Sequence, residues 1–349
     1  LAHGVTEHRF QGPLAADPSL SLEGVFWLAP DSPVVRFYYR LHSRAPRRLT
    51  KTGGRDALDY LGLSLAGYPA CTEVRLGEFD ESVHSFRLTE RQVPDRAFAH
   101  GLDLIGPLLV AGGAAHAALV AYEHGSQAPD VFIHYRLDPE RAVTLRAVKG
   151  AYYAGQLVEP GHPYETPWFH ACAVAGEEAA LARAYRAFLL RYQSPNRASR
   201  RPYIFYNTWN YQERNKWWNG ETFLASMHQA RILAEIDVAH RMGVEVFVID
   251  TGWYEKTGDW QVDRERFPDG LRAVKARLDG YGMKLGLWFS PRQAALSSRI
   301  RHAHRDCVMA WNGQESAPRP VWETEESQEL CLVSRYWEAF ADELIRLGG

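Results

Sequence analysis

The pattern of apolar and polar positions changes once along the chain, near residue 200. Before that point side chains alternate with a period of two, as at 35–42 and 131–137, which is typical of half-buried antiparallel strands. Turn-forming sequences such as Gly53-Gly54 and Gly112-Gly113 separate these runs. The pattern predicts an N-terminal antiparallel β-sandwich over residues 1–176.

A helical period follows the sandwich. Leu181, Tyr185 and Phe188 recur at spacings of three and four residues, so we expect a helix over about 177–192. The polar stretch that runs on to Pro202 is typical of a linker. Residues 177–201 are therefore predicted to be a helix and linker between two domains.

Strand and helix patterns alternate over residues 202–349. The predicted strands are 203–206, 244–249 and 283–289, and the predicted helices are 224–242, 271–281 and a last helix capped by Ser334. The second strand is apolar on nearly every position, as expected in a parallel sheet with both faces covered. Three consecutive β/α units fit either a doubly wound sheet or the start of a (β/α)8 barrel.

Polar and aromatic side chains follow each predicted strand at its carboxyl end, where chemistry gathers in both of these folds. Sugars bind such a combination, because their C–H faces stack on aromatic rings and their hydroxyls hydrogen-bond to Asp or Asn. The candidate sugar-binding residues are Asn207, Trp209, Asp250, Thr251, Trp253 and Trp288.

Each of these candidates also has a purely structural interpretation. A tryptophan at this edge can simply pack, and Asp250 can cap the following turn. A ligand-facing role is favoured for Asp250, because an unpartnered carboxylate directly after the apolar run 246–249 is costly to bury. His302 and His304 lack a third ligand at a suitable spacing, so a solvated loop is favoured there over a metal site.

Composition narrows the class of protein. The chain has 349 residues, of which 46% are hydrophobic and 23% charged, as in ordinary globular proteins. A net charge of −2 gives no reason to expect a nucleic-acid partner. The four cysteines form no CxxC pair, and no glycine-rich phosphate loop follows any strand, so we expect neither a thiolate zinc site nor nucleotide binding. No segment has the length of a membrane span or a signal-peptide core, and a cytoplasmic location is expected.

Several motifs after residue 200 have the order and spacing of a known family. They are Asn207-Thr208-Trp209, Val246 to Trp253, Gly258-Asp259-Trp260, Phe267 to Leu271, and Gly282 to Pro291. The sequence resembles the melibiase-type α-galactosidase family of retaining glycoside hydrolases over roughly residues 200–292. Looser similarity at Trp27 to Pro33 and Tyr164 to Trp168 extends the resemblance to the β-sandwich that precedes the barrel in that family.

The resemblance implies a (β/α)8 barrel and a retaining mechanism without a cofactor, in which one carboxylate is the nucleophile and a second is the acid/base. It implies that Asp250 hydrogen-bonds hydroxyls of the terminal sugar and that Trp288 lines the same subsite. Trp209 and Trp253 match positions at the rim. The implied partner is a small carbohydrate substrate, and since family members often associate, a homo-oligomer fits as well.

Two positions depart from the family pattern. Thr251 stands where the family usually has a second Asp, and Ser290-Pro291-Arg292 stands where a Glu-Pro-Glu type sequence is more common. Losing one charge-assisted hydrogen bond weakens sugar binding by about 1.5 to 3 kcal/mol. We therefore expect a preference for a sugar other than plain galactose, such as N-acetylgalactosamine.

The catalytic carboxylates of the family are not found. The nucleophile lies in a Lys-x-Asp sequence on the fourth strand, and residues 330–349 contain none. Both carboxylates are expected beyond Gly349, since a barrel takes about 250 residues and 202–349 holds its first three β/α units.

The chain is accordingly predicted to be the front part of a retaining α-glycosidase that removes terminal α-linked galactose or a related sugar from oligosaccharides. The alternatives are an α-N-acetylgalactosaminidase or a transglycosylase on the same scaffold, or a non-catalytic sugar-binding protein if the chain is naturally this short.

Overall fold

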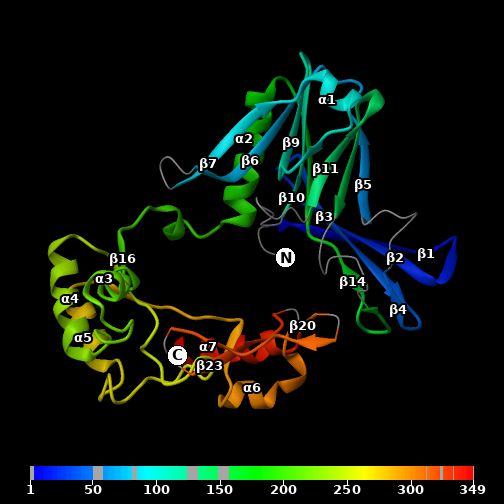
Figure 1. Cartoon of the computed structure of the whole chain (residues 1–349). Coiled ribbons are helices and arrows are strands. Elements are labelled where there is room, and N and C mark those ends of the chain that lie inside the picture. The colour runs from blue at the N-terminus through cyan, green and yellow to red at the C-terminus, as the bar shows by residue number, and fades with distance from the viewer. Residues whose placement is uncertain are drawn as a thin grey trace. The chain divides into compact units, whose positions relative to one another are not determined.

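A computed structural model describes residues 4–49, 58–80, 85–123, 133–147, 157–311, 313–322, 325–332 and 334–348 (Figure 1). The chain divides into two compact units, Leu1–Arg200 and Arg201–Gly349. The turn expected at Gly53-Gly54 and the first two residues of the strand expected at 131–137 lie outside the described residues.

The first unit is built on one large antiparallel sheet. Its strand order is β1-β2-β3-β15-β10-β9-β6-β7, and β14 pairs with β3 beside this path. The strands are β1 (Thr6–Leu14), β2 (Asp17–Leu28), β3 (Val34–Ser43), β6 (Ala70–Asp80), β7 (Ser85–Gln92), β9 (Leu108–Gly112), β10 (His116–Tyr122), β14 (Tyr164–Glu165) and β15 (Phe169–Ala175). Strands adjacent in this sheet run in opposite directions throughout the described pairs.

A second antiparallel sheet packs on one face of the first. Its strands, in spatial order, are β5 (Leu58–Ser64), β12 (Ala142–Ala147), β11 (Ile133–Asp138) and β8 (Asp103–Leu104). One buried cluster joins the two sheets, with Phe37 and Phe169 from the large sheet against Tyr135 and Leu145 from the small one. The predicted β-sandwich is confirmed by this arrangement.

Helix α2 (Glu178–Phe188) covers the other face of the large sheet. Its Leu181 and Phe188 are buried against Ala117 and Leu119 of β10 and Cys172 of β15. The helix therefore packs on the first unit. The short elements of this unit are β4 (Arg47–Arg48), β13 (Leu157–Val158), α1 (Asp95–Ala99), a π-helical turn (Leu189–Gln193) and 3-10 turns (Pro139–Arg141 and Ala198–Arg200).

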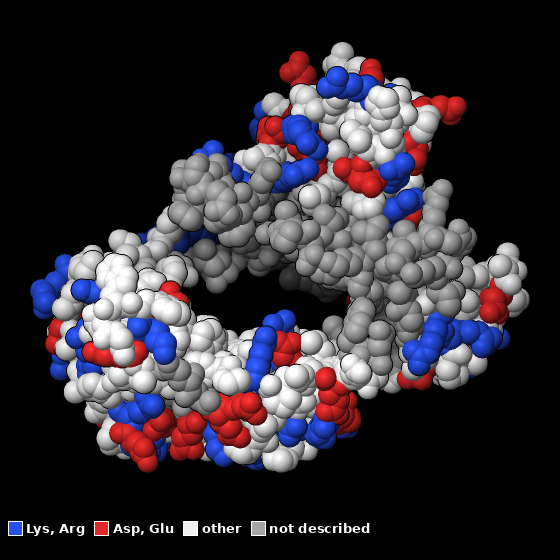
Figure 2. All heavy atoms as spheres, in the orientation of Figure 1, with Lys and Arg blue, Asp and Glu red and all other residues white. Residues whose placement is uncertain are grey.

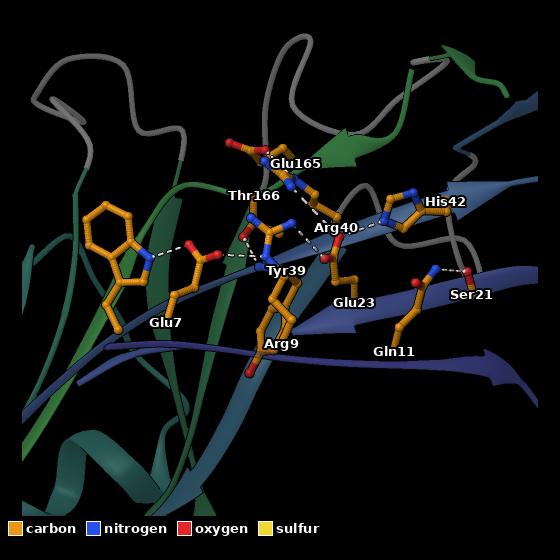
Figure 3. A network of polar contacts seen from close by, with 11 residues as sticks. Glu7, Arg9, Gln11, Ser21, Glu23, Tyr39, Arg40, His42, Glu165 and Thr166 are labelled. Atoms are coloured by element: carbon orange, nitrogen blue, oxygen red, sulfur yellow. Dashed lines mark hydrogen bonds and ion pairs between the residues drawn. The ribbon is translucent and has the colours of Figure 1, made fainter. Parts of the chain in front are cut away.

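A network of charged side chains ties β1, β2 and β3 together (Figure 3). Glu23 is buried at its centre, where its carboxylate receives Arg9 Nη1 at 3.4 Å and bonds His42 Nε2 at 2.8 Å. Arg40 reaches Glu165 of β14 at 2.7 Å. The pairs are cross-strand neighbours on one face of the sheet, so they stabilise the pairing register of these strands.

Charge is mixed on the surface that Figure 2 shows, where basic and acidic side chains alternate on the described residues of each unit. This distribution matches the net charge of −2 and offers no single-sign patch there for a polyanion. Within the described ranges no helix has the length and apolar character that crossing a membrane requires.

The second unit contains a three-stranded parallel sheet in the order β16 (Phe205–Asn207), β17 (Val246–Ile249) and β18 (Lys284–Leu287). Helices α4 (Gln229–Arg241) and α5 (Arg272–Gly280) pack on it, with Ile236 of α4 and Leu278 of α5 buried against Phe247 of β17. The parallel β/α order expected from the sequence is thus present in this unit.

Two helices differ from the expectation. Helix α3 (Trp209–Asn219) lies between β16 and α4, where none was predicted. It buries the polar side chains of Gln212 and Asn215, so it carries no apolar stripe. Helix α4 begins at Gln229 and not near 224, because His228 accepts the Arg231 N–H and caps it.

Short elements separate β18 from the last helix. They are β19 (Gln293–Ala295), α6 (Arg299–Ala303), a 3-10 turn (Arg305–Cys307), β20 (Ala310–Trp311), β21 (Gln314–Glu315), β22 (Arg319–Pro320) and β23 (Glu326–Glu329). Helix α7 (Tyr336–Gly348) then packs Phe340 into the core. Ser334 accepts the Tyr336 N–H at 3.3 Å at the start of this helix.

Candidate functional site

The carboxyl ends of β16 and β17 bring Asn207 and Asp250 together. Asn207 Nδ2 donates to Asp250 Oδ2 at 2.9 Å, and Asn207 Oδ1 accepts the Trp209 N–H at 2.7 Å. Thr208 is buried beneath them, and its Oγ1 accepts the Asp250 N–H at 2.9 Å. The two strands are paired in parallel with Asn207 opposite Val248, so adjacent strand ends place these side chains in reach of each other.

Asp250 is 6% exposed, and among the described residues no cation shifts the pKa of its carboxylate. Burial raises its pKa, while hydrogen bonds from the Thr251 N–H at 2.7 Å and from Asn207 partly oppose the shift. Within the described structure, no Lys or Arg acts on this pKa. Among the described residues, each carboxylate oxygen accepts one hydrogen bond, which leaves a second lone pair for a ligand hydroxyl.

Thr251 and Trp253 lie deeper than the other predicted residues. Thr251 has no exposed surface, and its Oγ1 is 2.7 Å from the Tyr254 hydroxyl. Trp253 is likewise fully buried, and its Nε1 donates to the Trp288 carbonyl at 3.0 Å. In this structure both side chains support the loop after β17 and the backbone of Trp288 from within the core.

Trp209 and Trp288 are half-buried and belong to an aromatic cluster. Trp209 stacks on Phe223 with centroids 5.1 Å apart and planes 12° from parallel. Trp322 meets Trp209 edge-on at 4.8 Å and Trp288 at 6.0 Å. Rings from α3, the end of β18 and two loops therefore gather beside the strand ends.

Sequence reasoning missed Phe223, Tyr254 and Trp322. Trp322 has a φ of 53°, a left-handed conformation that no local motif announces. It lies more than thirty residues beyond β18, so only the folded chain shows that it reaches Trp209. The sequence signal available for the others was the high content of aromatic residues after residue 200.

The described residues form no cluster of three His, Cys, Asp or Glu side chains arranged to hold a metal ion. His302 lies in α6 and is exposed, and His304 follows that helix. What the site offers instead is one buried carboxylate, one amide and several aromatic faces, which is a set that binds a neutral polyhydroxylated ligand.

A family comparison matches residues 164–321 to the Melibiase model. α-Galactosidase 1 of Pediococcus pentosaceus is 31% identical over 107 residues, which cover 29% of this chain and 15% of that protein. The sequence match thus includes the loops after β16, β17 and β18.

Solved structures show the same fold over nearly the whole chain. The α-galactosidase of Lactobacillus brevis superposes with a TM-score of 0.62 at 16% identity, covering 99% of this chain and 46% of that one. Variants of the α-galactosidase AgaA of Geobacillus stearothermophilus, in complex with raffinose and with stachyose, each give 0.57 at 14% and 13% identity. For these two, the coverage is 93% and 98% of this chain and 45% and 50% of the neighbour.

The chain spans about half the length of these structures. Sequence and fold comparisons agree with each other and with the strand-end motifs. Over residues 164–321 the chain is similar to the Melibiase family, and its fold is that of these α-galactosidase structures.

Proposed function

We propose that the protein is a retaining α-glycosidase of the α-galactosidase type, and that the second unit supplies the subsite for the terminal sugar of its substrate. Asp250 and Asn207 bind hydroxyls of that sugar, and Trp209 and Trp288 pack against its C–H face. Thr251 and Trp253 act one layer further in, by holding Tyr254 and the Trp288 backbone in place.

The observation that supports this proposal most strongly is the burial and hydrogen bonding of the Asp250 carboxylate. A buried carboxylate without a neighbouring cation costs stability, and its raised pKa reflects that cost. Hydrogen bonds from Asn207 and the Thr251 N–H fix its orientation at the end of β17. A charge held in this way is well suited to accept hydrogen bonds from a ligand, which strengthen when water is excluded.

The parallel unit supports a further step of the proposal, that it forms part of a (β/α)8 barrel. Its sheet order follows chain order, and the candidate residues cluster at the carboxyl ends of the strands, as they do in such barrels. A retaining mechanism needs two carboxylates about 5 Å apart. Within the described structure no second carboxylate acts on the pKa of Asp250, so we assign neither catalytic role in residues 1–349.

Thr251 favours a second candidate function, an α-N-acetylgalactosaminidase. Its hydroxyl is engaged by Tyr254 and has no exposed surface, so it offers the sugar no hydrogen bond. A sugar in this subsite then makes fewer hydrogen bonds on the side of Thr251. On that side an N-acetyl group can replace a sugar hydroxyl without loss of a hydrogen bond to the protein.

The test is calorimetric titration of the protein with nitrophenyl α-galactoside, α-N-acetylgalactosaminide and α-glucoside, because neither catalytic carboxylate is assigned in residues 1–349. We expect a galacto-configured sugar to bind, with a tighter affinity for the N-acetylated sugar if Thr251 sets specificity. A clear preference for plain α-galactoside would refute the second candidate alone. Equal or tighter binding of the α-glucoside, or no binding of the three, would refute the proposed function.

A further inference from the structure

Two cysteines of the second unit, Cys307 and Cys331, lie opposite each other, although 23 residues separate them in the sequence. Val308 and Leu330 form an antiparallel bridge, and the Cys331 N–H donates to the Cys307 carbonyl at 2.8 Å. The two cysteines are therefore direct cross-strand neighbours. Residues paired in this way have Cα atoms about 5.5 Å apart, and a disulfide bond spans about 4.4 to 6.8 Å between Cα atoms.

The Cys307 thiol faces the segment that begins at Cys331. Arg335 belongs to that segment, and its pKa is raised by a hydrogen bond to the Asp306 carboxylate, at 2.7 Å, and by its interaction with the Cys307 thiol. Opposite residues of an antiparallel pair also place their side chains on the same face. Formation of a disulfide here then requires rotation of the side chains and no large movement of the backbone.

The four cysteines differ in access and in neighbours. Cys307 is buried and Cys331 is half-buried, so a dissolved oxidant meets Cys331 first. Cys71 and Cys172 are buried in the first unit, where burial raises the pKa of both thiols, that of Cys71 to about 11. Neither has a cysteine as its cross-strand partner in the described sheets. Because the thiolate is the reactive form, we expect these two thiols to be inert.

The cysteine pair encloses a segment that contributes to the candidate site. Residues 308–330 contain β20 to β23, between α6 and α7 in Figure 1. They also contain Trp322, whose ring meets Trp209 at 4.8 Å and Trp288 at 6.0 Å. A bond between the two sulfurs closes a loop of 25 residues around this segment. Closing a loop reduces the conformational entropy of the unfolded chain, which stabilises the folded one.

We propose that Cys307 and Cys331 form a reversible disulfide when the protein meets a small-molecule disulfide, and that this bond holds the segment that carries Trp322. The Cys331 thiolate attacks one sulfur of the oxidant, which forms a mixed disulfide and releases one thiolate. The Cys307 thiolate then attacks the Cys331 sulfur and releases the second. Two electrons pass from the protein thiols to the oxidant, and their two protons end on the two released thiols. A dithiol reductant reverses the reaction by the same kind of exchange.

The experiment is incubation of the protein with oxidised glutathione, followed by thiol counting in denaturant and by peptide mapping. We expect two of the four thiols to be lost, one linked peptide pair that contains Cys307 and Cys331, and recovery of all four thiols with dithiothreitol. We also expect oxidation to raise the urea midpoint of unfolding by about 0.5 to 1.5 M, as a disulfide that closes a loop of this length does.

Two variants separate the pair from the other thiols. Cys331→Ala removes the pair, so oxidised glutathione neither lowers its thiol count nor raises its urea midpoint. Cys172→Ala is the matched control, because it removes a thiol of the first unit and leaves the pair intact. In this variant we expect oxidation to consume two thiols and to raise the midpoint as in the wild type.

Four results would overturn the proposal. They are an unchanged thiol count, a glutathione adduct on Cys331 that does not proceed to the linked pair, a link between other cysteines or between two molecules, and a linked pair with an unchanged urea midpoint. All four are read on the wild-type protein, so they decide the question even where a variant fails to fold. None of them involves a sugar, so the proposed function stands or fails separately.

Discussion

Replacing Asp250 by Asn separates a ligand-binding carboxylate from a structural cap. The Thr251 N–H keeps its acceptor in this variant, but the introduced amide meets Asn207 Nδ2, so the Asn207 amide must turn and release the Trp209 N–H. One neutral hydrogen bond is worth about 0.5 to 1.5 kcal/mol. Removing a desolvated charge offsets that loss, as the raised pKa of Asp250 indicates.

We therefore expect the free energy of unfolding of Asp250→Asn to stay within about 1.5 kcal/mol of wild type. Sugar binding loses a hydrogen bond to a charged acceptor, about 1.5 to 3 kcal/mol, which corresponds to a loss of affinity of roughly 10-fold to 150-fold. Urea unfolding and calorimetric titration with methyl α-galactoside measure the two quantities.

Asp259→Asn is the matched control. This carboxylate also belongs to the loop after β17, but its oxygens accept the Arg299 and Ile300 N–H groups at 3.0 Å at the start of α6. We expect the control to lose about 0.5 to 2 kcal/mol of stability and no affinity for the sugar. Asp250 does not bind the sugar if Asp250→Asn keeps full affinity, or if the main effect of this substitution is a stability loss larger than that of Asp259→Asn.

Three further predictions follow from the same contacts. Affinity for the sugar falls as the pH is lowered through the pKa of Asp250, which burial places above 3.8, and an affinity unchanged down to pH 3.8 would contradict this. Gly252→Ala lowers the free energy of unfolding by about 1 to 3 kcal/mol, because φ is +97° and the new Cβ would lie 2.8 Å from Met227 Cγ; an unchanged urea midpoint would argue against that packing. Burial alone would raise the pKa of Glu123, but hydrogen bonds led by that of Arg36 lower it to about 2. The ionised Glu123 therefore stabilises the fold above pH 4.5, and this stabilisation is lost between about pH 4.5 and 2. In Arg36→Met we expect urea midpoints measured against pH to lack this decrease.

The sandwich could be predicted because alternating side chains leave a period of two wherever one face is buried. Strand β11 shows this directly, since Tyr135 and Leu137 face the core between the two sheets. Helix α3 could not be predicted in the same way. Its buried face carries Gln212, whose Nε2 donates to the Thr251 carbonyl, and Asn215, whose Oδ1 accepts from Asn219, so the apolar period that identifies a helix is missing.

How deeply each side chain at the strand ends is buried could not be predicted from the sequence either. Chain order places Asn207 and Asp250 after neighbouring strands, and the structure joins them at 2.9 Å. Trp253 and Trp288 also follow neighbouring strands, so the sequence predicts a sugar contact equally for both. In the structure, however, Trp253 is enclosed by Tyr254, Trp260 and Phe289. Tertiary packing of distant loops decides which indole is exposed, and a periodic pattern holds no information about that packing.

The most direct measurement is a crystal structure of the protein with a bound α-galactoside. We expect the terminal sugar at the ends of β16 and β17, with a hydroxyl about 2.5 to 3.0 Å from an Asp250 carboxylate oxygen and the C–H face against Trp288 or Trp209. A sugar bound elsewhere, or one seated there without a hydrogen bond to Asp250, would contradict this expectation.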